Sequence, residues 1–271
     1  MNACKHITFF NTPLRIPFLS EIIAEANSYP CQTDIFIHTN ESFPLDDNSY
    51  NNGTVKVVVH NLGNLDPFYL SWKCRELIKT QQNEYDIFIY TEDDIRIPAA
   101  ALSYWLHYTA ILSPLNFNLG FVRVEENSGT EYCVDLTAPI NSYLFLKEEC
   151  FYLNHNNTYC GCWIYSQKEV KRFIERERFK LFNTRVDTPR RLHFSRELSA
   201  IGQHDMIDRR FSATLIPGRL EVSPQGSLRS LVHSDSRVYH LSKNYSSETE
   251  TPWGVLPFKD CTKPTPVSFF W

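Results

Sequence analysis

The sequence predicts an α/β fold, in which a mainly parallel central sheet is flanked by helices and followed by a more irregular second half. Two observations support this prediction. Short runs rich in β-branched and aromatic residues alternate with segments of helical periodicity between about residues 5 and 112. One run, residues 55–60, is dominated by valine, which is typical of a strand covered on both faces.

In the first half, four strands are predicted at residues 5–10, 33–38, 55–60 and 86–90. Helices are predicted at residues 16–28, 66–82 and 99–112. The first has apolar residues at helical spacing, and Asp66-Pro67 and Pro98 are typical of helix starts. Right-handed crossovers would place the loops after the first two strands beside the end of the fourth. Those loops carry Asn11, Thr12, Thr39 and Asn40.

The second half is expected to contain short strands and two helical segments. Strands are predicted at 119–125, 143–146, 159–165, 214–216, 219–222 and 237–241. A helix should follow Ser166 to about residue 179, and a second helical region, interrupted at Gly202, should span 195–211. No repeat or low-complexity linker separates the two halves, so one domain over residues 1–271 is expected.

The stretch around which the chain is organised is residues 85–98, YDIFIYTEDDIRIP. A buried strand here ends in Glu92, Asp93 and Asp94. Because side chains alternate along an extended strand, Glu92 and Asp94 should project together and Asp93 should point away. Clustered carboxylates at this edge of an α/β sheet suit a hard divalent cation that also holds phosphate oxygens. The alternative is that the acids occupy a solvated turn before the helix that follows Pro98.

Composition excludes several classes of function. The net charge of −4 and the pI of about 6.1 give no basic surface for general nucleic-acid binding. The N-terminal segment is neither a signal peptide nor a membrane span, so a cytoplasmic location is expected, or a chain trimmed of its anchor. Peripheral contact with the inner face of a membrane is left open by the basic run 185–191 and the aromatic end 269–271.

The eight cysteines are scattered along the chain, which favours reduced, mostly buried thiols over a disulfide framework. Cys160-Gly161-Cys162 is the one close pair, and it lacks the second pair that a structural zinc site needs. Gly161 itself is expected either to mark a bulge or to let a ligand approach the backbone.

The strand that ends in Glu92, Asp93 and Asp94 resembles the DxD motif of GT-A fold nucleotide-sugar glycosyltransferases, with Glu92 in place of the commoner Asp. Residues 66–75 and 159–166 are similar to segments of the same group. The resemblance implies a donor, such as a UDP-sugar, bound by about residues 1–125, with an acceptor bound by about residues 126–271. It implies Mn²⁺ or Mg²⁺ as cofactor. The nucleotide-sugar ligands would be Asn11, Thr12, Thr39, Glu92, Asp93 and Lys243, and the metal ligands Glu92, Asp94 and His240.

A catalytic base is also implied. Gly202 to Asp205 resembles the segment that supplies this base in inverting GT-A enzymes, where a carboxylate removes the proton of the acceptor hydroxyl. Asp205 is therefore the candidate base, although an acid at a helix N-terminus explains it equally well. His240 competes with His233 for the role of metal ligand.

These observations predict a metal-dependent glycosyltransferase of the hexosyltransferase type, acting in polysaccharide biosynthesis and passing a sugar to a hydroxyl of a glycan or glycolipid. Inversion is preferred because Asp205 is available. One alternative is a noncatalytic nucleotide- or glycan-binding module on the same fold. Another is a metal-dependent nucleotidyltransferase, for which residues 11–15 would be a poor phosphate loop.

Overall fold

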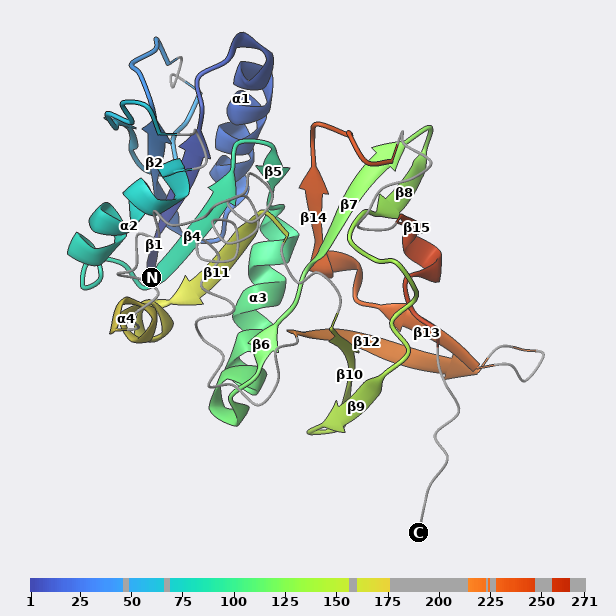
Figure 1. The fold of residues 1–271 in the computed structure, drawn as a ribbon. Helices are drawn as coiled ribbons and strands as arrows, with labels where there is room; N and C mark the ends of the chain where they lie inside the picture. The colour runs from blue at the N-terminus through green and yellow to red at the C-terminus, as the bar shows by residue number, and fades with distance from the viewer. Residues whose placement is uncertain are drawn as a thin grey trace. The chain divides into compact units, whose positions relative to one another are not determined.

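The computed structural model describes residues 1–45, 49–65, 69–155, 160–175, 214–222, 224, 228–246 and 255–263 (Figure 1). These residues form two compact units. The first unit contains residues 1–102 and 161–175, and the second contains residues 103–160 and the described residues from 214 onward. The second unit therefore begins as an insertion within the sequence of the first. The single catalytic domain expected over residues 1–271 stays a prediction.

The first unit is built on a five-stranded sheet with the order β11-β4-β1-β2-β3. Its strands are β1 (Asn2–Phe9), β2 (Gln32–Thr39), β3 (Val55–Val59), β4 (Ile87–Glu92) and β11 (Cys162–Ser166). The first four strands run parallel, and β11 pairs antiparallel with β4 at the edge. Helix α1 (Ile16–Glu25) connects β1 to β2, α2 (Leu70–Thr80) lies between β3 and β4, and α4 (Gln167–Glu175) follows β11.

Helices cover both faces of this sheet. Neighbouring residues of β1 point to opposite faces, and two of them contact different helical segments. Lys5 donates from Nζ to Ile22 O of α1 at 3.2 Å and to Tyr29 Oη at 3.0 Å. The next residue, His6, faces Gln81, which directly follows α2. Burial lowers the pKa of Lys5 to about 7, so this amine is largely uncharged above neutral pH.

The predicted α/β class is confirmed.

The second unit contains two further sheets. One has the strand order β13-β12-β10-β9 with β6 beside β12, and the other includes the run β15-β8-β7-β14. Their strands are β6 (Asn118–Leu119), β7 (Val122–Asn127), β8 (Thr130–Cys133), β9 (Tyr143–Leu146), β10 (Glu149–Asn154), β12 (Thr214–Val222), β13 (Leu228–Val232), β14 (Arg237–His240) and β15 (Leu256–Pro257). Helix α3 (Ala99–Leu112) contains the point where the chain passes from the first unit to the second.

The prediction of a mainly parallel sheet is wrong for the described chain, because each of its three sheets mixes parallel and antiparallel pairs. The alternation of strands and helices predicted the parallel pairs of β1 to β4 correctly. A strand was also predicted at residues 159–165, but nothing in the alternation indicated that this strand, β11, returns to pair with β4 in the first sheet. The hairpins of the second unit lack crossover helices and are therefore antiparallel.

Several element boundaries differ from those predicted. Residues 214–216 and 219–222 form one strand, β12, because Pro217 and Gly218 continue the extended backbone between them. A Cβ on Gly218 would lie 2.4 Å from Tyr152 Cε2, so the strand needs glycine at this close approach. Residues 66–68 and 176–213, which include the whole of the predicted helical region 195–211, lie outside the described residues.

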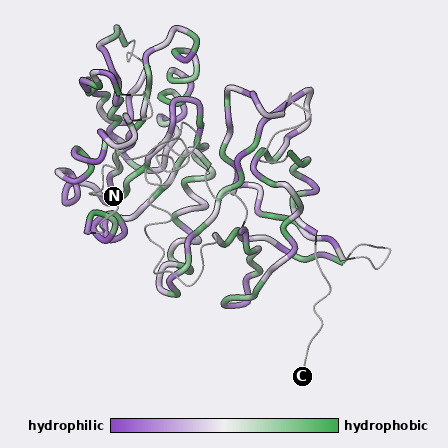
Figure 2. Tube along the Cα trace, viewed as in Figure 1, coloured by the Kyte–Doolittle hydropathy of each residue, from purple (hydrophilic) through white to green (hydrophobic). Residues whose placement is uncertain are grey.

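Helix α4 begins as predicted, immediately after Ser166. Glu169 N donates to Ser166 Oγ at 3.3 Å, and Ser166 N donates to Glu169 Oε2 at 2.9 Å, which is a reciprocal capping box. The helix carries both hydrophilic and hydrophobic residues (Figure 2), and its buried face includes Val170 and Phe173. None of the helices in the described part of the chain is long and apolar enough to cross a membrane.

All eight cysteines are buried and none forms a disulfide, which confirms the prediction of buried thiols. Burial raises the pKa of Cys74 and of Cys160 to about 12. These thiols are therefore protonated at neutral pH and behave as small apolar side chains.

Three histidines form a hydrogen-bonded row: His6 is in β1, His38 is in β2, and His60 directly follows β3. His6 Nδ1 lies 2.9 Å from His38 Nε2, and His38 Nδ1 lies 2.8 Å from His60 Nε2. Neighbouring rings stack, with centroids 5.2 and 5.1 Å apart. Burial lowers the pKa of His6 to about 3 and also lowers the pKa of His38 and of His60. The row is therefore neutral at physiological pH.

Acidification should destabilise the first unit through this row. The unfolded chain takes up protons near pH 6.5, whereas native His6 does so only near pH 3. The unfolded state therefore binds more protons in this window, and each buried histidine lowers the free energy of unfolding by up to ~1.4 kcal/mol per pH unit as the pH falls. His38→Gln should reduce this slope in urea titrations between pH 6.5 and 4. The exposed His155→Gln serves as control, and equal slopes in both variants would contradict the prediction.

Candidate nucleotide site at the acid turn

The three predicted acids lie at the carboxyl end of β4. Strand β4 ends at Glu92. Asp93 and Asp94 then form a turn, which is followed by the short strand β5 (Ile95–Arg96). We call Glu92, Asp93 and Asp94 the acid turn. In the parallel register, Thr8 of β1 is opposite Glu92, so the loop after β1 begins beside the acid turn. Strand β1 has β2 on one side and β4 on the other, so this edge is the topological switch point where α/β sheets bind ligands.

Arg15 joins the loop after β1 to the acid turn. It lies at the end of the 3₁₀ helix η1 (Pro13–Arg15), and its Nη1 donates to Asp94 Oδ2 at 3.0 Å and, at shorter range, to Asp93 Oδ1. The Arg15 side chain is 39% exposed, whereas both aspartate side chains are buried. Burial raises the pKa of Asp93 to about 7, although the charge of Arg15 opposes this shift. No pattern in the sequence indicated that Arg15 contacts the acids.

The predicted orientation of Asp93 is wrong. Asp93 and Asp94 do not point apart, because both bind the same guanidinium. The alternation that predicted opposite directions holds only within an extended strand, and the extended strand ends at Glu92.

Glu92 lies against the start of β11. Its backbone N donates to Gly161 O at 2.9 Å. Gly161 has φ of +66°, and a Cβ there would lie 3.2 Å from Glu92 Oε2 and 2.5 Å from Ile95 Cγ1. Glycine is therefore required by both the left-handed backbone and the close packing. This observation favours the structural alternative for Gly161, a tight backbone position, over a role in admitting a ligand.

Three other predicted donor-site residues lie at the same edge, in the loop after β1 or at the end of β2. Asn11 N donates to Asn40 Oδ1 at 3.0 Å, which joins the loops after β1 and β2. Thr12 O accepts from Arg15 N at 3.0 Å. Thr39 is fully buried and its Oγ1 donates to Glu41 O at 3.3 Å, so it holds the loop in shape. The structure therefore brings Asn11, Thr12 and Thr39 to the sheet edge that carries the acid turn.

The remaining predicted residues belong elsewhere. His240 and Lys243 are in the second unit, and Asp205 lies outside the described residues. His240 Nδ1 contacts Glu125 Oε1 at 2.5 Å, and His240 Nε2 contacts Ser242 Oγ at 2.8 Å. The roles of His240 as metal ligand, Lys243 as phosphate ligand and Asp205 as base stay predictions.

The carboxylate oxygens of the acid turn are the donor type that Mg²⁺ and Mn²⁺ prefer. In the described residues, no three His, Cys, Asp or Glu side chains are arranged around a common metal position. A cation at the acid turn would therefore draw on few protein ligands, and phosphate oxygens of a nucleotide would complete its shell, as is usual for Mg²⁺.

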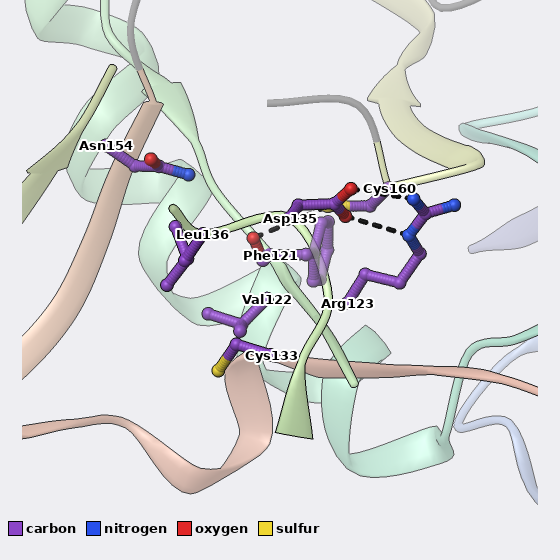
Figure 3. A pocket seen from close by; sticks show the side chains of 8 residues that line it. All are labelled: Phe121, Val122, Arg123, Cys133, Asp135, Leu136, Asn154 and Cys160. Atoms are coloured by element: carbon purple, nitrogen blue, oxygen red, sulfur yellow. Dashed lines mark hydrogen bonds and ion pairs between the residues drawn. The ribbon is translucent and has the colours of Figure 1, made fainter. Parts of the chain in front are cut away.

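A second polar cluster lies inside the second unit, and the sequence did not reveal it. Arg123 donates from Nε to Asp135 Oδ2 at 2.8 Å and from Nη2 to Asp135 Oδ1 at 2.7 Å, and both residues are buried. The pair lines a cavity of about 10 Å³ with Phe121, Leu136 and Cys160 (Figure 3), which is room for about one water molecule. Burial alone would lower the pKa of Arg123, but the charge of Asp135 raises it well above its ordinary value. The only sequence signal is a charged residue between valines in β7.

The fold and the acid turn thus define an α/β protein with a carboxylate-rich edge at its switch point. No protein-family model matches the chain, and the curated proteins contain no match to it.

Proposed function

We propose that this protein is a metal-dependent glycosyltransferase that uses a nucleotide diphosphate sugar, such as a UDP-sugar, as donor. The observation that carries the proposal is the position of the acid turn at the switch point of a parallel four-stranded segment, within hydrogen-bonding distance of the loop after β1. An anionic nucleotide needs positive charge at such an edge, and Arg15 supplies one cation there. A divalent cation held by Glu92 and Asp94 would supply the other.

Arg15 determines how such a site would work. Two buried carboxylates share its guanidinium, so a divalent cation that takes Asp94 must replace this ion pair. Arg15 keeps Asp93 as a partner and is partly exposed, which leaves donor groups for a phosphate oxygen. The cation, when bound, would neutralise charge on the departing diphosphate. Asn11 and Thr12 would contact the nucleotide from the neighbouring loop.

Transfer further requires a base for the acceptor hydroxyl, and Asp205 is the proposed one. The acceptor would be a hydroxyl of a glycan or glycolipid, with the protein in the cytoplasm or peripherally at a membrane. His240 would be a third metal ligand only if its Nε2 exchanged Ser242 for the cation, and Lys243 would contact phosphate.

A thermal-shift panel tests this proposal. Nucleoside diphosphates, nucleoside triphosphates and nucleotide sugars would each be added with and without Mn²⁺. A donor at 100 times its Kd stabilises the folded state by ~2.7 kcal/mol. Stabilisation by UDP and UDP-sugars that depends on Mn²⁺ is the expected result. Preference for triphosphates would favour a nucleotidyltransferase, and binding without transfer to any acceptor would favour a noncatalytic module.

Asp94→Asn should remove the metal dependence of nucleotide binding. The substitution keeps the shape of the side chain but removes the charge that a divalent cation needs, while Asp93 still holds Arg15. Since loss of an outer-shell partner already costs about 10- to 100-fold in metal affinity, loss of a direct ligand should weaken UDP binding in Mn²⁺ by at least that factor. Calorimetry with and without Mn²⁺ provides the measurement.

The exposed Glu76→Gln, in α2 of the same unit, is the matched control for this change of charge. It should bind UDP and Mn²⁺ like the wild type. If Asp94→Asn also matched the wild type in Mn²⁺, Asp94 would not be a metal ligand. A loss that appeared equally without Mn²⁺ would instead point to damage of the nucleotide pocket.

A further inference from the structure

A serine, a histidine and a glutamate form a continuous hydrogen-bonded relay in the second unit. Tyr239 pairs with Val124 in the parallel register of β14 and β7, so His240 and Glu125 are neighbours across the two strands. Ser242 Oγ lies 2.8 Å from His240 Nε2, and His240 Nδ1 lies 2.5 Å from Glu125 Oε1. This is the order of contacts by which a base and a carboxylate activate a nucleophilic hydroxyl.

Hydrogen bonding determines the proton positions in the relay. Glu125 also accepts from Tyr245 N at 3.2 Å and from Ser246 N at 2.6 Å. Because these backbone N–H groups can only donate, the Glu125 oxygens act as acceptors, as carboxylate oxygens do. A neutral imidazole must then carry its proton on Nδ1. Its Nε2 lone pair is left to accept from the hydroxyl of Ser242.

The surroundings hold the base and leave the hydroxyl at the edge of the cluster. His240 and Glu125 are buried, whereas Ser242 is half-buried. The ring of Tyr245 stacks on His240 with centroids 5.1 Å apart, and the Arg123 guanidinium lies 5.3 Å from the Tyr245 centroid. Because both ring nitrogens and one ring face are engaged, the imidazole has a fixed orientation toward Ser242.

We propose that Ser242 is a nucleophile that accepts an acyl group from a carboxylic ester. The Ser242 Oγ–carbon bond forms as the ester carbon–oxygen bond breaks, the hydroxyl proton passes to His240 Nε2, and the departing alkoxide takes that proton and leaves as an alcohol. Glu125 is a positioning residue, which holds the tautomer that the step requires. This activity needs neither nucleotide nor metal, and a cation bound to His240 Nε2 would compete with it.

A fluorophosphonate probe tests the nucleophile, because it forms an Oγ–phosphorus bond with an activated serine and releases fluoride. The full chain in EDTA would be treated with the probe and examined by peptide mass spectrometry. The expected result is one adduct, at Ser242, in the wild type and in Ser234→Ala, and none in Ser242→Ala. Ser234 is the matched control, because its hydroxyl bonds Asp235 rather than an imidazole in the described part of the chain. An unlabelled wild type, or an adduct that persists in Ser242→Ala, would overturn the proposal.

Glu125→Gln separates the relay from a structural role. The glutamine amide can donate to Nδ1 and so favour the wrong tautomer, and the comparable change in a serine-protease triad lowers kcat about 10⁴-fold. In a variant with wild-type circular dichroism, the labelling rate should fall at least about 10²-fold and its pH profile should change. If Glu125→Gln does not fold, His240→Gln replaces it in the same measurement. A folded variant that labels at the wild-type rate would show that the relay does not activate Ser242.

Discussion

Asp135→Ala should lower the free energy of unfolding of the second unit by ~3–5 kcal/mol, the usual cost of removing one partner from a buried ion pair. The substitution leaves Arg123, a residue that is 5% exposed, without its bidentate carboxylate. The adjacent cavity has room for about one water, which cannot replace two charged hydrogen bonds. Urea denaturation monitored by circular dichroism would measure the loss.

The control for this prediction is an exposed pair of the same chemistry in the same unit. Arg219 Nε lies 2.7 Å from Glu221 Oε1, but the side chains are 71% and 44% exposed. Glu221→Ala should therefore change stability by only ~0–1 kcal/mol. A double variant, Arg123→Met with Asp135→Leu, should recover much of the loss, because it removes both charges of the pair and leaves neither without its partner. Equal effects of Asp135→Ala and Glu221→Ala would show that the buried pair does not hold the unit together.

Asp205→Asn should reduce glycosyl transfer by about 10²- to 10⁴-fold, the usual contribution of a positioned general base. Nucleotide binding should persist, because the proposed donor site is built from the loops after β1, β2 and β4. Transfer to acceptor and calorimetric binding of UDP with Mn²⁺ would be measured on the same preparation. This comparison distinguishes loss of a base from loss of folding, which would lower both quantities.

Asp260→Asn is the matched control, since it changes an exposed aspartate with no proposed role in the same way. Full transfer by Asp205→Asn would move the role of base to Asp208 or Glu221, or indicate a retaining mechanism. No transfer by the wild type with any donor that binds would favour the noncatalytic module.

The local part of the fold could be predicted from the sequence, and the non-local part could not. Apolar runs and helical spacing identified β1, β2, β3, β4, α1 and α3, because each pattern reports burial within a few neighbouring residues. The same reasoning placed Glu92 at a strand end. It missed the ion pairs of Arg15, because no local pattern links a residue after β1 to a turn after β4.

The second unit was harder to predict from the sequence for the same reason. His240 was selected from the sequence, but its partner Glu125 is 115 residues away and looked like the end of an ordinary strand. A charged residue inside an apolar strand, as at Arg123 and Glu125, is the signal that could have been used. Such residues are buried only with partners, so each one predicts a contact without saying which.

The antiparallel strand β11 also affects how the protein is made. During synthesis, β4 can pair with β1 early, but its other edge gains a partner only after residues 95–161 have been added. At about 5–20 residues per second, this edge stays open for on the order of 10 s. Residues 87–90, IFIY, are apolar and β-forming, so the nascent chain exposes a template for intermolecular pairing. Yield of folded protein should therefore depend on chaperones more than on the stability of the finished fold.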